Sequence, residues 1–599
     1  MSRTNRTACG AARATEVATQ IELYGWVHRR RDLGGLIFID LRDRSGIVQV
    51  KFDPAHPSAY TQAAELRLET VVHISGTIQR RPSGTENKEL ATGEVEIDAE
   101  SLVILNRSKT PPFAINDGGT VEEQLRLRYR YLDLRRPRMT ANLWLRHRMT
   151  KAIRDFLDQE GFLEIETPVL IRSTPEGARD YLVPSRLRPG HVYALAQSPQ
   201  LYKQLLMVGG IDRYFQIVRC YRDEDLRADR QPEFTQLDLE MSFVTEEDVI
   251  DVIERAFAYT WRQVLDREIA MPIRRITHAE SMLRYGVDKP DLRYGLEIGE
   301  LTAVFRATEF KIFRQVVEAG GAIRAIRIPG AAGEGAKEIE AWTEVAKGEK
   351  ARGLAYWHLR ADGWESPIAK FFSGAELDGL REATGAQPGD LVVAVADRVE
   401  VVAAALGAVR KAVARRRGLI PAGTFEFVWI TEFPLFEKSQ ETGETTAAHH
   451  PFTSPRPEDL DLMTTDPLKV RARAYDLVLN GTELGSGSIR IHDPEMQQQV
   501  FSGLGMTRED AVRRFGFLLE AFGYGAPPHG GFAFGLDRVV MIAANEETIR
   551  EVVAFPKNQQ AEEVMSDAPA PADEKQLREL GLELRRLPAH DGQKGSAKP

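Results

Sequence analysis

The segment YRDEDLRADRQPEFTQLDLE, residues 221–240, constrains the fold of this chain more than any other stretch. An apolar run over residues 214–221 leads into a loop rich in acidic and basic side chains, and an alternating run over residues 234–244 follows. This pattern predicts an antiparallel hairpin with a long charged loop. A solvent-exposed hairpin tip is the alternative interpretation. By itself the charged loop favours the exposed tip, although three polar residues that share one face of the second strand suit the floor of a polar site, namely Gln236, Asp238 and Glu240.

The chain is long enough for several domains. Its 599 residues exceed what one hydrophobic core supports, so we expect three or more domains. A hydrophobic content of 43% with 28% charged residues is typical of a soluble globular protein, and no apolar run approaches the ~18 residues of a membrane span. Cys9 and Cys220 are the only cysteines, so neither a disulfide framework nor a zinc cluster is expected. The N-terminus, MSRTNRTACG, lacks an apolar signal region, and these observations together predict a cytoplasmic protein.

Positive charge is concentrated in three short clusters, although the net charge is −9. Residues 29–31 are all arginine, six arginines occur within residues 126–138, and residues 415–417 are again arginine. Such runs usually form solvated surfaces. Local fields rather than net charge govern binding to nucleic acids, however, and residues 18–107 contain short alternating strands typical of a small barrel. We therefore expect the first two clusters to contact nucleic-acid phosphates.

Changes in composition divide the chain into six segments. A helix over residues 141–159 leads into FLEIETPVL, where Pro168 ends a strand, and alanine and glycine become more frequent after residue 294. The linker-like stretch SDAPAPADEK begins the last segment. The predicted boundaries are 1–107 for the barrel, 108–140 for a hinge, 141–293, 294–421 and 422–557 for three further segments, and 558–599 for a C-terminal extension.

A glycine-rich segment, GGFAFGLDRVVMIAA at residues 530–544, predicts a strand that passes into a helix near Leu536. Small side chains let the backbone approach a ligand, and Arg538 in the first helical turn adds charge to the positive end of the helix. This combination predicts contact with phosphate groups. The alternative is an ordinary helix start with a surface arginine. This alternative is reasonable for the segment alone, but it explains the segment and the charged hairpin together poorly.

Together these segments resemble class II aminoacyl-tRNA synthetases. The hairpin is similar to motif 2, residues 530–544 are similar to motif 3, and the helix and strand before Pro168 are similar to the dimer-forming motif 1. The resemblance covers nearly the whole chain and is closest to the bacterial-type aspartyl enzymes of subclass b. It implies a multidomain α+β fold with an N-terminal OB-fold β-barrel that binds the anticodon, an antiparallel-sheet catalytic domain flanked by helices, and an α+β insertion domain.

The resemblance implies an ATP site shared by motifs 2 and 3. The implied catalytic residues are Arg222, at the α-phosphate and the reacting carboxylate, and Arg538, at the γ-phosphate. No general base is needed, because a carboxylate is already ionised at neutral pH. Mg²⁺ would be held by Asp476 and Glu483, acids that in an isolated turn would be solvated. The implied ATP-binding residues are Arg222, Asp223, Glu224, Gln231, Phe234, Glu483, Gly535, Leu536, Asp537 and Arg538.

The resemblance also implies a site for L-aspartate. Lys203 and Arg490 match positions that grip the side-chain carboxylate, and Asp238 would balance their charge. A histidine pair such as His449 and His450 is by itself more often structural, but its place among these motifs favours a role in the pocket. The implied aspartate-binding residues are Glu176, Ser198, Gln200, Lys203, Arg222, Asp238, His449 and Arg490.

The implied macromolecular partner is tRNA(Asp), bound by a homodimer, with neither DNA nor a membrane as a partner. The spacing of Phe38 alone favours a core residue, whereas the resemblance places it with Gln49 and Glu96 at the anticodon. Leu33 stands where several relaxed enzymes, which also charge tRNA(Asn), carry histidine, but Gly84 is typical of relaxed enzymes. We expect strict charging of tRNA(Asp), with charging of both tRNAs as the alternative. The implied anticodon-binding residues are Arg29, Arg31, Leu33, Phe38, Gln49 and Glu96.

Three other interpretations are weaker. Asparagine or lysine as the substrate conflicts with Lys203 and with the insertion between motifs 2 and 3. A single-stranded RNA-binding module without catalysis would leave Arg222 and Arg538 without a role. A P-loop or dinucleotide enzyme would need a Gly-Lys-Ser/Thr sequence or a GxGxxG sequence after a strand, and neither occurs.

Overall fold

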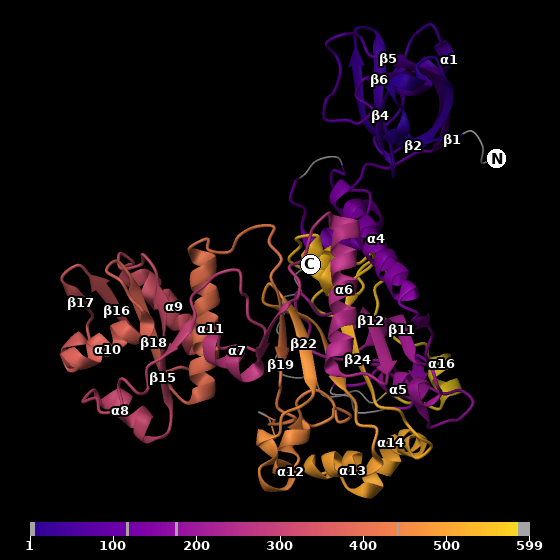
Figure 1. The fold of residues 1–599 in the computed structure, drawn as a ribbon. Helices are drawn as coiled ribbons and strands as arrows, with labels where there is room; N and C mark the ends of the chain where they lie inside the picture. Colours follow the sequence, from indigo (N-terminus) through magenta and orange to yellow (C-terminus); the bar gives the residue numbers. More distant parts are fainter. Residues whose placement is uncertain (1–5, 116–118, 174–177, 440–441, 585–599) are drawn as a thin grey trace. The chain divides into compact units, whose positions relative to one another are not determined.

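The computed structural model describes residues 6–115, 119–173, 178–439 and 442–584 (Figure 1). The chain divides into two compact units, Met1–Trp144 with Arg550–Pro571 and Leu145–Ile549 with Ala572–Pro599. No described helix is both long and apolar enough to cross a membrane.

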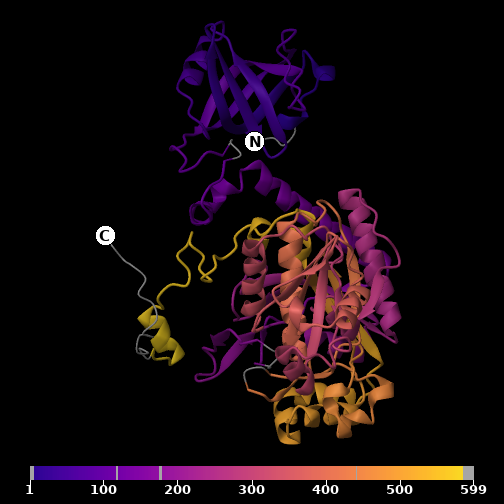
Figure 2. The same ribbon diagram turned by 90° about the vertical axis from the view of Figure 1, so that its left-hand side faces the viewer.

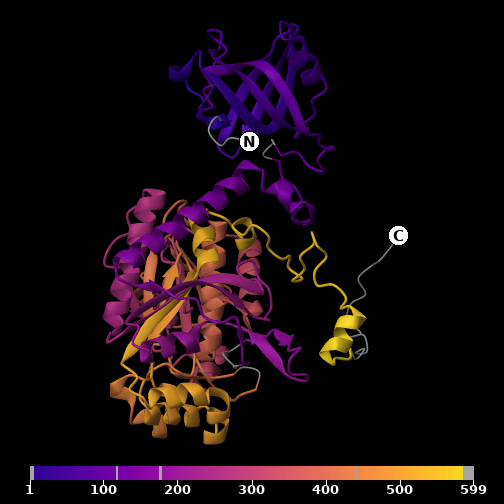
Figure 3. The ribbon, with the colours of Figure 1, turned by 90° about the vertical axis from the view of Figure 1, so that its right-hand side faces the viewer.

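The first unit contains a closed β-barrel, as expected from the sequence (Figure 3). The sheet has the order β1-β2-β3-β4-β6-β5, and pairing of β2 with β5 closes it. Buried and exposed side chains alternate along the strands, so that aliphatic residues such as Leu23, Ile39 and Ile97 fill the interior. The elements are β1 (Arg6–Thr7), β2 (Gln20–Leu33), β3 (Leu36–Asp43), β4 (Gly46–Phe52), α1 (Pro57–Ala64), β5 (Val71–Arg80) and β6 (Val95–Asn106).

The arginine cluster at residues 126–138 lies in α2 (Glu123–Arg128), α3 (Arg130–Asp133) and the start of α4 (Pro137–Gln159). Arg126 forms ion pairs with Asp133 at 3.0 Å and with Glu551 at 2.6 Å, and Arg130 pairs with Asp133 at 2.7 Å. Asp133 is completely buried. The prediction that this cluster contacts phosphates is therefore wrong for Arg126 and Arg130, because their guanidinium groups are used inside the unit.

An eight-stranded sheet forms the centre of the second unit, with the order β13-β19-β22-β23-β24-β12-β11-β7. The predicted hairpin is confirmed: β11 and β12 pair in antiparallel fashion from Arg213↔Met241 to Tyr221↔Glu233. On its other edge β12 pairs with β24, so the charged hairpin and the glycine-rich segment are neighbours in the sheet. The strands are β7 (Leu163–Glu164), β11 (Arg213–Tyr221), β12 (Glu233–Ser242), β13 (Arg274–Thr277), β19 (Phe427–Thr431), β22 (Ala474–Leu479), β23 (Thr482–Ile489) and β24 (His529–Gly535).

Helices pack around this sheet (Figures 1 and 2). Phe257 and Trp261 of α6 contact Phe427 of β19, and Phe257 also contacts Phe534 of β24, which fixes α6 against the sheet. The helix that follows β24 begins at Leu536, as predicted. The helices of the second unit outside the insertion are α5 (Gln200–Val208), α6 (Glu246–Leu265), α7 (His278–Arg284), α12 (Leu462–Thr465), α13 (Pro494–Gly503), α14 (Arg508–Phe522), α15 (Leu536–Ala543) and α16 (Glu574–Leu580), of which α16 lies away from the sheet (Figure 2).

The insertion predicted for residues 294–421 leaves the eight-stranded sheet after β13 and returns at β19, the strand that pairs with β13 in parallel. Its sheet has the order β14-β15-β18-β16-β17, and α9 and α11 cover one face while α8 and α10 cover the other. Arg410 lies over the rings of Tyr285 and Tyr294 at the entry to the insertion. The elements are β14 (Ile298–Glu300), α8 (Lys311–Glu318), β15 (Ala322–Ile328), α9 (Ala336–Gly348), β16 (Ala355–Arg360), β17 (Gly363–Glu365), α10 (Gly374–Thr384), β18 (Leu391–Asp397) and α11 (Val399–Arg416).

Two smaller sheets complete the second unit. One has the order β8-β10-β9, with β8 (Leu170–Ile171), β9 (Leu182–Pro184) and β10 (Val192–Leu195). The other pairs β20 (Phe436–Lys438) with β21 (Thr445–Ala447). Because β10 ends just before Ser198 and α5, the first of these sheets leads the chain into the pocket described next.

Candidate active site

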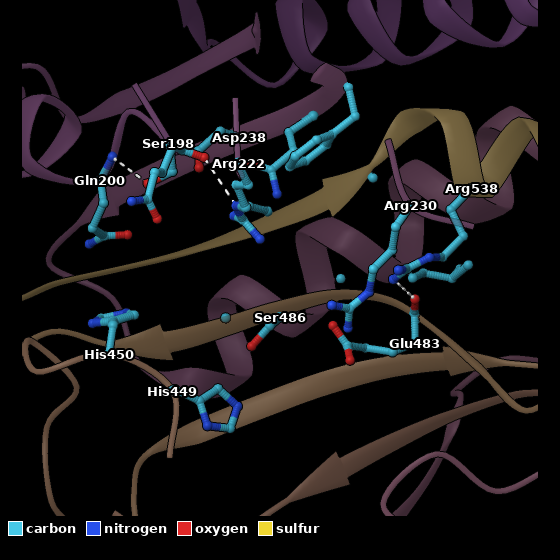
Figure 4. Close-up of a pocket in the computed structure, with 18 of the residues that line it drawn as sticks. Ser198, Gln200, Arg222, Arg230, Asp238, His449, His450, Glu483, Ser486 and Arg538 are labelled. Atoms are coloured by element: carbon cyan, nitrogen blue, oxygen red, sulfur yellow. Dashed lines mark hydrogen bonds between the residues drawn. The ribbon is translucent and has the colours of Figure 1, made fainter. Parts of the chain in front are cut away.

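A pocket of about 320 Å³ opens over the polar faces of β12, β23 and β24 (Figure 4). The β11–β12 loop and the segment around His449 and His450 contribute to its walls. The backbone of β24 approaches β12 very closely. A Cβ atom at Gly531 would lie 2.1 Å from Glu240 Oε2 and 2.2 Å from Leu239 O, so only glycine fits there.

One end of the pocket is built from two cations and two carboxylates. Lys203 Nζ lies 3.0 Å from a carboxylate oxygen of both Asp238 and Glu240, and Arg490 Nε donates to Glu240 Oε1 at 2.9 Å. All four side chains are at most 3% exposed. This is a fixed, water-poor array of alternating charges, in which every interaction is stronger than at the surface.

The pKa values of the two carboxylates in this array shift in opposite directions. Burial raises the pKa of Asp238, although Lys203 opposes the shift. Burial also acts against the ionised form of Glu240, but the charges of Arg490 and Lys203 outweigh it and lower the pKa of Glu240 to about 2. Glu240 is thus an anion at neutral pH. The sequence analysis predicted Glu240 on the polar face of this strand but gave it no role. Its position two residues after Asp238, on the same face, is the sequence feature that could have indicated one.

The two histidines have different partners. His450 Nε2 accepts a hydrogen bond from Arg490 Nη1, and burial together with the Arg490 charge lowers the pKa of His450. His449 Nε2 lies 3.1 Å from Asp476 Oδ1; burial works against the charged ring, yet the Asp476 carboxylate raises the pKa of His449. His450, rather than His449, therefore contacts the predicted carboxylate-gripping arginine.

The middle of the pocket contains the arginine predicted to face the reacting carboxylate. Arg222 Nε donates to Gln197 O at 3.4 Å, and its guanidinium lies 5.1 Å from the centre of the Phe234 ring. Ser198 and Gln200 also line the pocket, and Gln200 Nε2 donates to Gln204 Oε1 at 3.0 Å. Glu176 lies outside the described residues.

The opposite end gathers the groups predicted for the nucleotide. Arg538, Arg230 and Glu483 converge there (Figure 4). Arg538 Nη1 donates to Glu483 O, and its Nη2 lies 3.1 Å from Asp229 Oδ2. Arg230 pairs with Glu224 at 3.1 Å. Of the ten residues predicted for ATP, eight line the pocket, namely Arg222, Glu224, Gln231, Phe234, Glu483, Gly535, Asp537 and Arg538.

Two of the residues predicted to bind ATP do not line the pocket. The side chain of a third, Asp537, holds two elements of the fold together. Leu536 is buried at 1% exposure. The backbone of Asp223 pairs with Arg179, and the two side chains lie 3.5 Å apart. The Asp537 carboxylate accepts from Thr235 N at 2.8 Å and pairs with Arg146, so it ties α15 to β12.

Asp476 and Glu483 face each other across the β22–β23 turn. Burial and the neighbouring Asp476 carboxylate raise the pKa of Glu483. A buried and a partly buried carboxylate that repel each other suit a divalent cation whose remaining ligands come from phosphate oxygens and water, so the donor set fits Mg²⁺.

The predicted anticodon residues lie on the barrel. Arg29 and Arg31 of β2, Phe38 of β3, Gln49 of β4 and Glu96 of β6 occupy one face by register, and Ile37 and Ile39 on either side of Phe38 point into the core. Arg31 Nη2 donates to Gln49 Oε1 at 3.0 Å, and Gln49 Nε2 donates to Glu96 Oε2 at 2.7 Å. Leu33 ends β2 and is 61% exposed. Phe38 is therefore not a core residue, contrary to what its spacing alone favours.

Comparison with known proteins places this site in a family. The family model of class II tRNA synthetases (D, K and N) matches residues 122–559, and that of the OB-fold nucleic acid binding domain matches residues 21–105. The chain is a class II aminoacyl-tRNA synthetase. Synthetases of this class are ATP-dependent ligases, and the chain is therefore an enzyme of that kind.

Relatives match this synthetase over almost its whole length. The aspartate–tRNA(Asp/Asn) ligase of Moorella thermoacetica is 55% identical over 96% of each chain, and that of Heliobacterium modesticaldum is 53% identical over 96% of this chain and 95% of its own. Among solved structures, a putative aspartyl-tRNA synthetase from Leishmania major has a TM-score of 0.59 at 19% identity over 94% of this chain and 95% of its own. Asparaginyl-tRNA synthetase from Pyrococcus horikoshii, complexed with asparaginyl-adenylate, has a TM-score of 0.58 at 17% identity over 92% and 98%. At these identities the solved structures show the shared fold, which agrees with the expected fold class.

Proposed function

We propose that the protein is an aspartate–tRNA ligase, which makes aspartyl-adenylate and pyrophosphate from L-aspartate and ATP and then transfers aspartate to the 3′ end of tRNA(Asp). The observation that carries this proposal is the array of Lys203, Asp238, Glu240 and Arg490 at the closed end of the pocket. The relatives named as aspartate–tRNA(Asp/Asn) ligases support it.

The array favours a negatively charged side chain over its amide. Glu240 accepts hydrogen bonds from Nε and Nη2 of Arg490. His450 and Ser488 contact Nη1 of Arg490. Lys203 pairs with Asp238 and Glu240. Among the described residues, these contacts leave one N–H group of each cation for a substrate carboxylate. Asparagine would present an uncharged group to the same donors. Charge-assisted hydrogen bonds are about twice as strong as neutral ones, so aspartate is preferred without an editing step. Ser198, Gln200 and Glu176 are proposed for the α-ammonium group, and His449 with His450 for the wall beside it.

Activation requires the α-carboxylate of aspartate to attack the α-phosphorus of ATP while pyrophosphate leaves. Arg222, stacked against Phe234, is proposed to contact both the carboxylate and the α-phosphate and to neutralise the charge that develops between them. Arg538 lies where the β- and γ-phosphates would extend, and Phe234 offers its ring to adenine. Mg²⁺ held by Asp476 and Glu483 would neutralise phosphate charge when bound.

Transfer requires a ribose hydroxyl at the tRNA 3′ end to attack the aspartyl carbonyl, with AMP as the leaving group. The barrel is proposed to hold the anticodon, with a base stacked on Phe38 and its edge against Gln49 and Glu96. Arg29 and Arg31 are proposed to supply positive charge that attracts the phosphate backbone of the tRNA. A cytoplasmic location follows from this role in protein synthesis.

A homodimer is proposed from exposed apolar side chains on β7 and on the three-stranded sheet β8-β10-β9. Leu163, Leu170 and Leu182 are 54%, 50% and 58% exposed, and Val192 and Tyr193 on β10 are also exposed. A second copy of the chain would cover them through the same surface on each subunit. Leu170→Arg is expected to shift the mass in sedimentation equilibrium from two chains to one, whereas Leu419→Arg, at an exposed position of the insertion, is expected to leave it unchanged. A wild-type monomer would contradict the dimer.

Charging of both tRNA(Asp) and tRNA(Asn) is the second candidate function. It is favoured by the names of the relatives, which are aspartate–tRNA(Asp/Asn) ligases. Leu33, exposed at the end of β2, is the contrary observation. If the wild type is strict, Leu33→His is expected to raise charging of tRNA(Asn); an unchanged ratio of the two charging rates would remove Leu33 as a determinant.

The test of the first half-reaction is exchange of labelled pyrophosphate into ATP without tRNA. Exchange that depends on aspartate, and that asparagine and lysine do not support, is the expected result. Equal exchange with asparagine would contradict the role proposed for the charged array.

A further inference from the structure

Arg538 already has an anionic partner in the structure. Its Nη2 lies 3.1 Å from Asp229 Oδ2, its Nη1 donates to Glu483 O, and its Nε is buried without a hydrogen-bond partner. The carbonyl of Glu483 belongs to the sheet and remains in place when a ligand binds. Within the described parts of the chain, the ion pair of Arg538 that a phosphate would have to replace is the one with the Asp229 carboxylate.

The backbone beside Asp229 is anchored. Ala228 O accepts hydrogen bonds from Ile549 N at 3.1 Å and from Thr548 Oγ1 at 2.9 Å, which holds the β11–β12 loop against the chain that follows α15. Asp229 is thus presented to Arg538 by a fixed peptide, and the contact is not a chance meeting of two long side chains. The side chain itself is 35% exposed, so it has room to turn toward water.

A carboxylate and a terminal phosphate cannot share this guanidinium without strong repulsion. Because the ion pair is partly exposed, its separation costs little. A phosphate group with about two negative charges competes with it effectively.

We propose that Asp229 is a displaceable counter-ion of Arg538. It is a positioning residue that holds the guanidinium in place when the pocket is empty and gives way to the terminal phosphates of ATP. After the adenylate has formed, Asp229 competes with pyrophosphate for Arg538. This inference rests on the proposed function of the pocket. It predicts a sign: Asp229 opposes the binding of ATP and of pyrophosphate. A residue that helped to bind the nucleotide, directly or through a metal ion, would have the opposite effect.

The experiment compares Asp229→Asn with Asp225→Asn in the full-length protein. Asparagine keeps the size of the side chain and removes its charge. Asp225 belongs to the same loop, is exposed, and forms no ion pair among the described residues, so its variant controls for the general loss of one negative charge. The dissociation constant of ATP is measured by direct calorimetric binding, and the KM values of ATP and pyrophosphate by the exchange assay.

Asp229→Asn is expected to lower the ATP dissociation constant and the pyrophosphate KM about two- to five-fold, as the loss of an exposed ion pair would. Asp225→Asn is expected to change both by less than half of that effect. Unchanged or weaker binding of ATP by Asp229→Asn, or equal tightening in both variants, would overturn the proposal. Absence of exchange in the wild type would instead count against the proposed function, because direct ATP binding still reports on Asp229.

Discussion

Replacement of Lys203 by methionine removes one cation from the charged array and keeps most of the side-chain volume. Lys203 is 1% exposed and lies 3.0 Å from both Asp238 and Glu240. Glu240 retains Arg490, but Asp238 is left as a buried carboxylate without its cation. An unpaired buried charge of this kind costs about 3–5 kcal/mol. Burial already raises the pKa of Asp238, so we expect the carboxylate in the variant to take up a proton and to avoid most of this cost.

The loss in substrate binding can then be estimated. The substrate carboxylate loses one charge-assisted hydrogen bond, worth about 1.5–3 kcal/mol, so the aspartate KM in the exchange assay is expected to rise by roughly 10- to 150-fold. The effect should grow with pH, because deprotonation of Asp238 in the variant places a second anion beside the substrate. The wild type keeps Lys203 and is expected to show a flatter profile.

Lys151→Met is the matched control, because the Lys151 side chain is 64% exposed and pairs with Asp155 at the surface of α4. It is expected to leave the aspartate KM and its pH profile unchanged. Circular dichroism and thermal unfolding show whether each variant is folded. A folded Lys203→Met protein with an aspartate KM within about two-fold of the wild type, and with the same pH profile, would refute the role given to the array.

Three further predictions follow from named contacts. Gly531→Ala places a Cβ atom 2.1 Å from Glu240 Oε2, so it is expected to lower the melting temperature and to abolish exchange, whereas an active, equally stable variant would contradict the close packing of β24 on β12. Phe38→Ala is expected to raise the tRNA KM about ten-fold through the loss of one stacked base while exchange without tRNA stays unchanged; a change in exchange would contradict a role confined to the barrel. The pKa of Glu240 is lowered to about 2, so its charge stabilises the folded state above the unfolded pKa near 4.5, and this contribution is lost as the pH falls through 2. In urea unfolding followed by tryptophan fluorescence, the wild type is expected to exceed Glu240→Gln by about 3 kcal/mol at pH 7 and by progressively less below pH 5; a pH-independent difference would contradict the ion pairing.

Local sequence patterns predicted the parts of the fold that are determined by neighbouring residues. The alternation around Asp238 correctly predicted the β11–β12 hairpin and its polar face, and glycines before Leu536 correctly predicted the strand-to-helix passage at Arg538. Both signals come from periodicity and small side chains, which depend on a few adjacent positions.

Contacts between distant segments were not predictable in this way. Arg126 was expected at a phosphate, but it pairs with Glu551, which is far away in the sequence. Glu240 and His450 were present in the quoted motifs, yet their roles depend on contacts with Arg490, the residue that follows β23. Asp229 meets Arg538 only because the loop is anchored on Ile549. In each case the partner is determined by tertiary packing.

The most direct test of the central claim is transfer of labelled aspartate, with ATP and magnesium, onto purified tRNA(Asp) and tRNA(Asn) in parallel. Aspartate–tRNA ligase activity predicts charging of tRNA(Asp), and charging of tRNA(Asn) at a comparable rate would assign the second candidate function to the same pocket. Failure to charge either tRNA with aspartate, by a protein that is folded and binds ATP, would contradict the account.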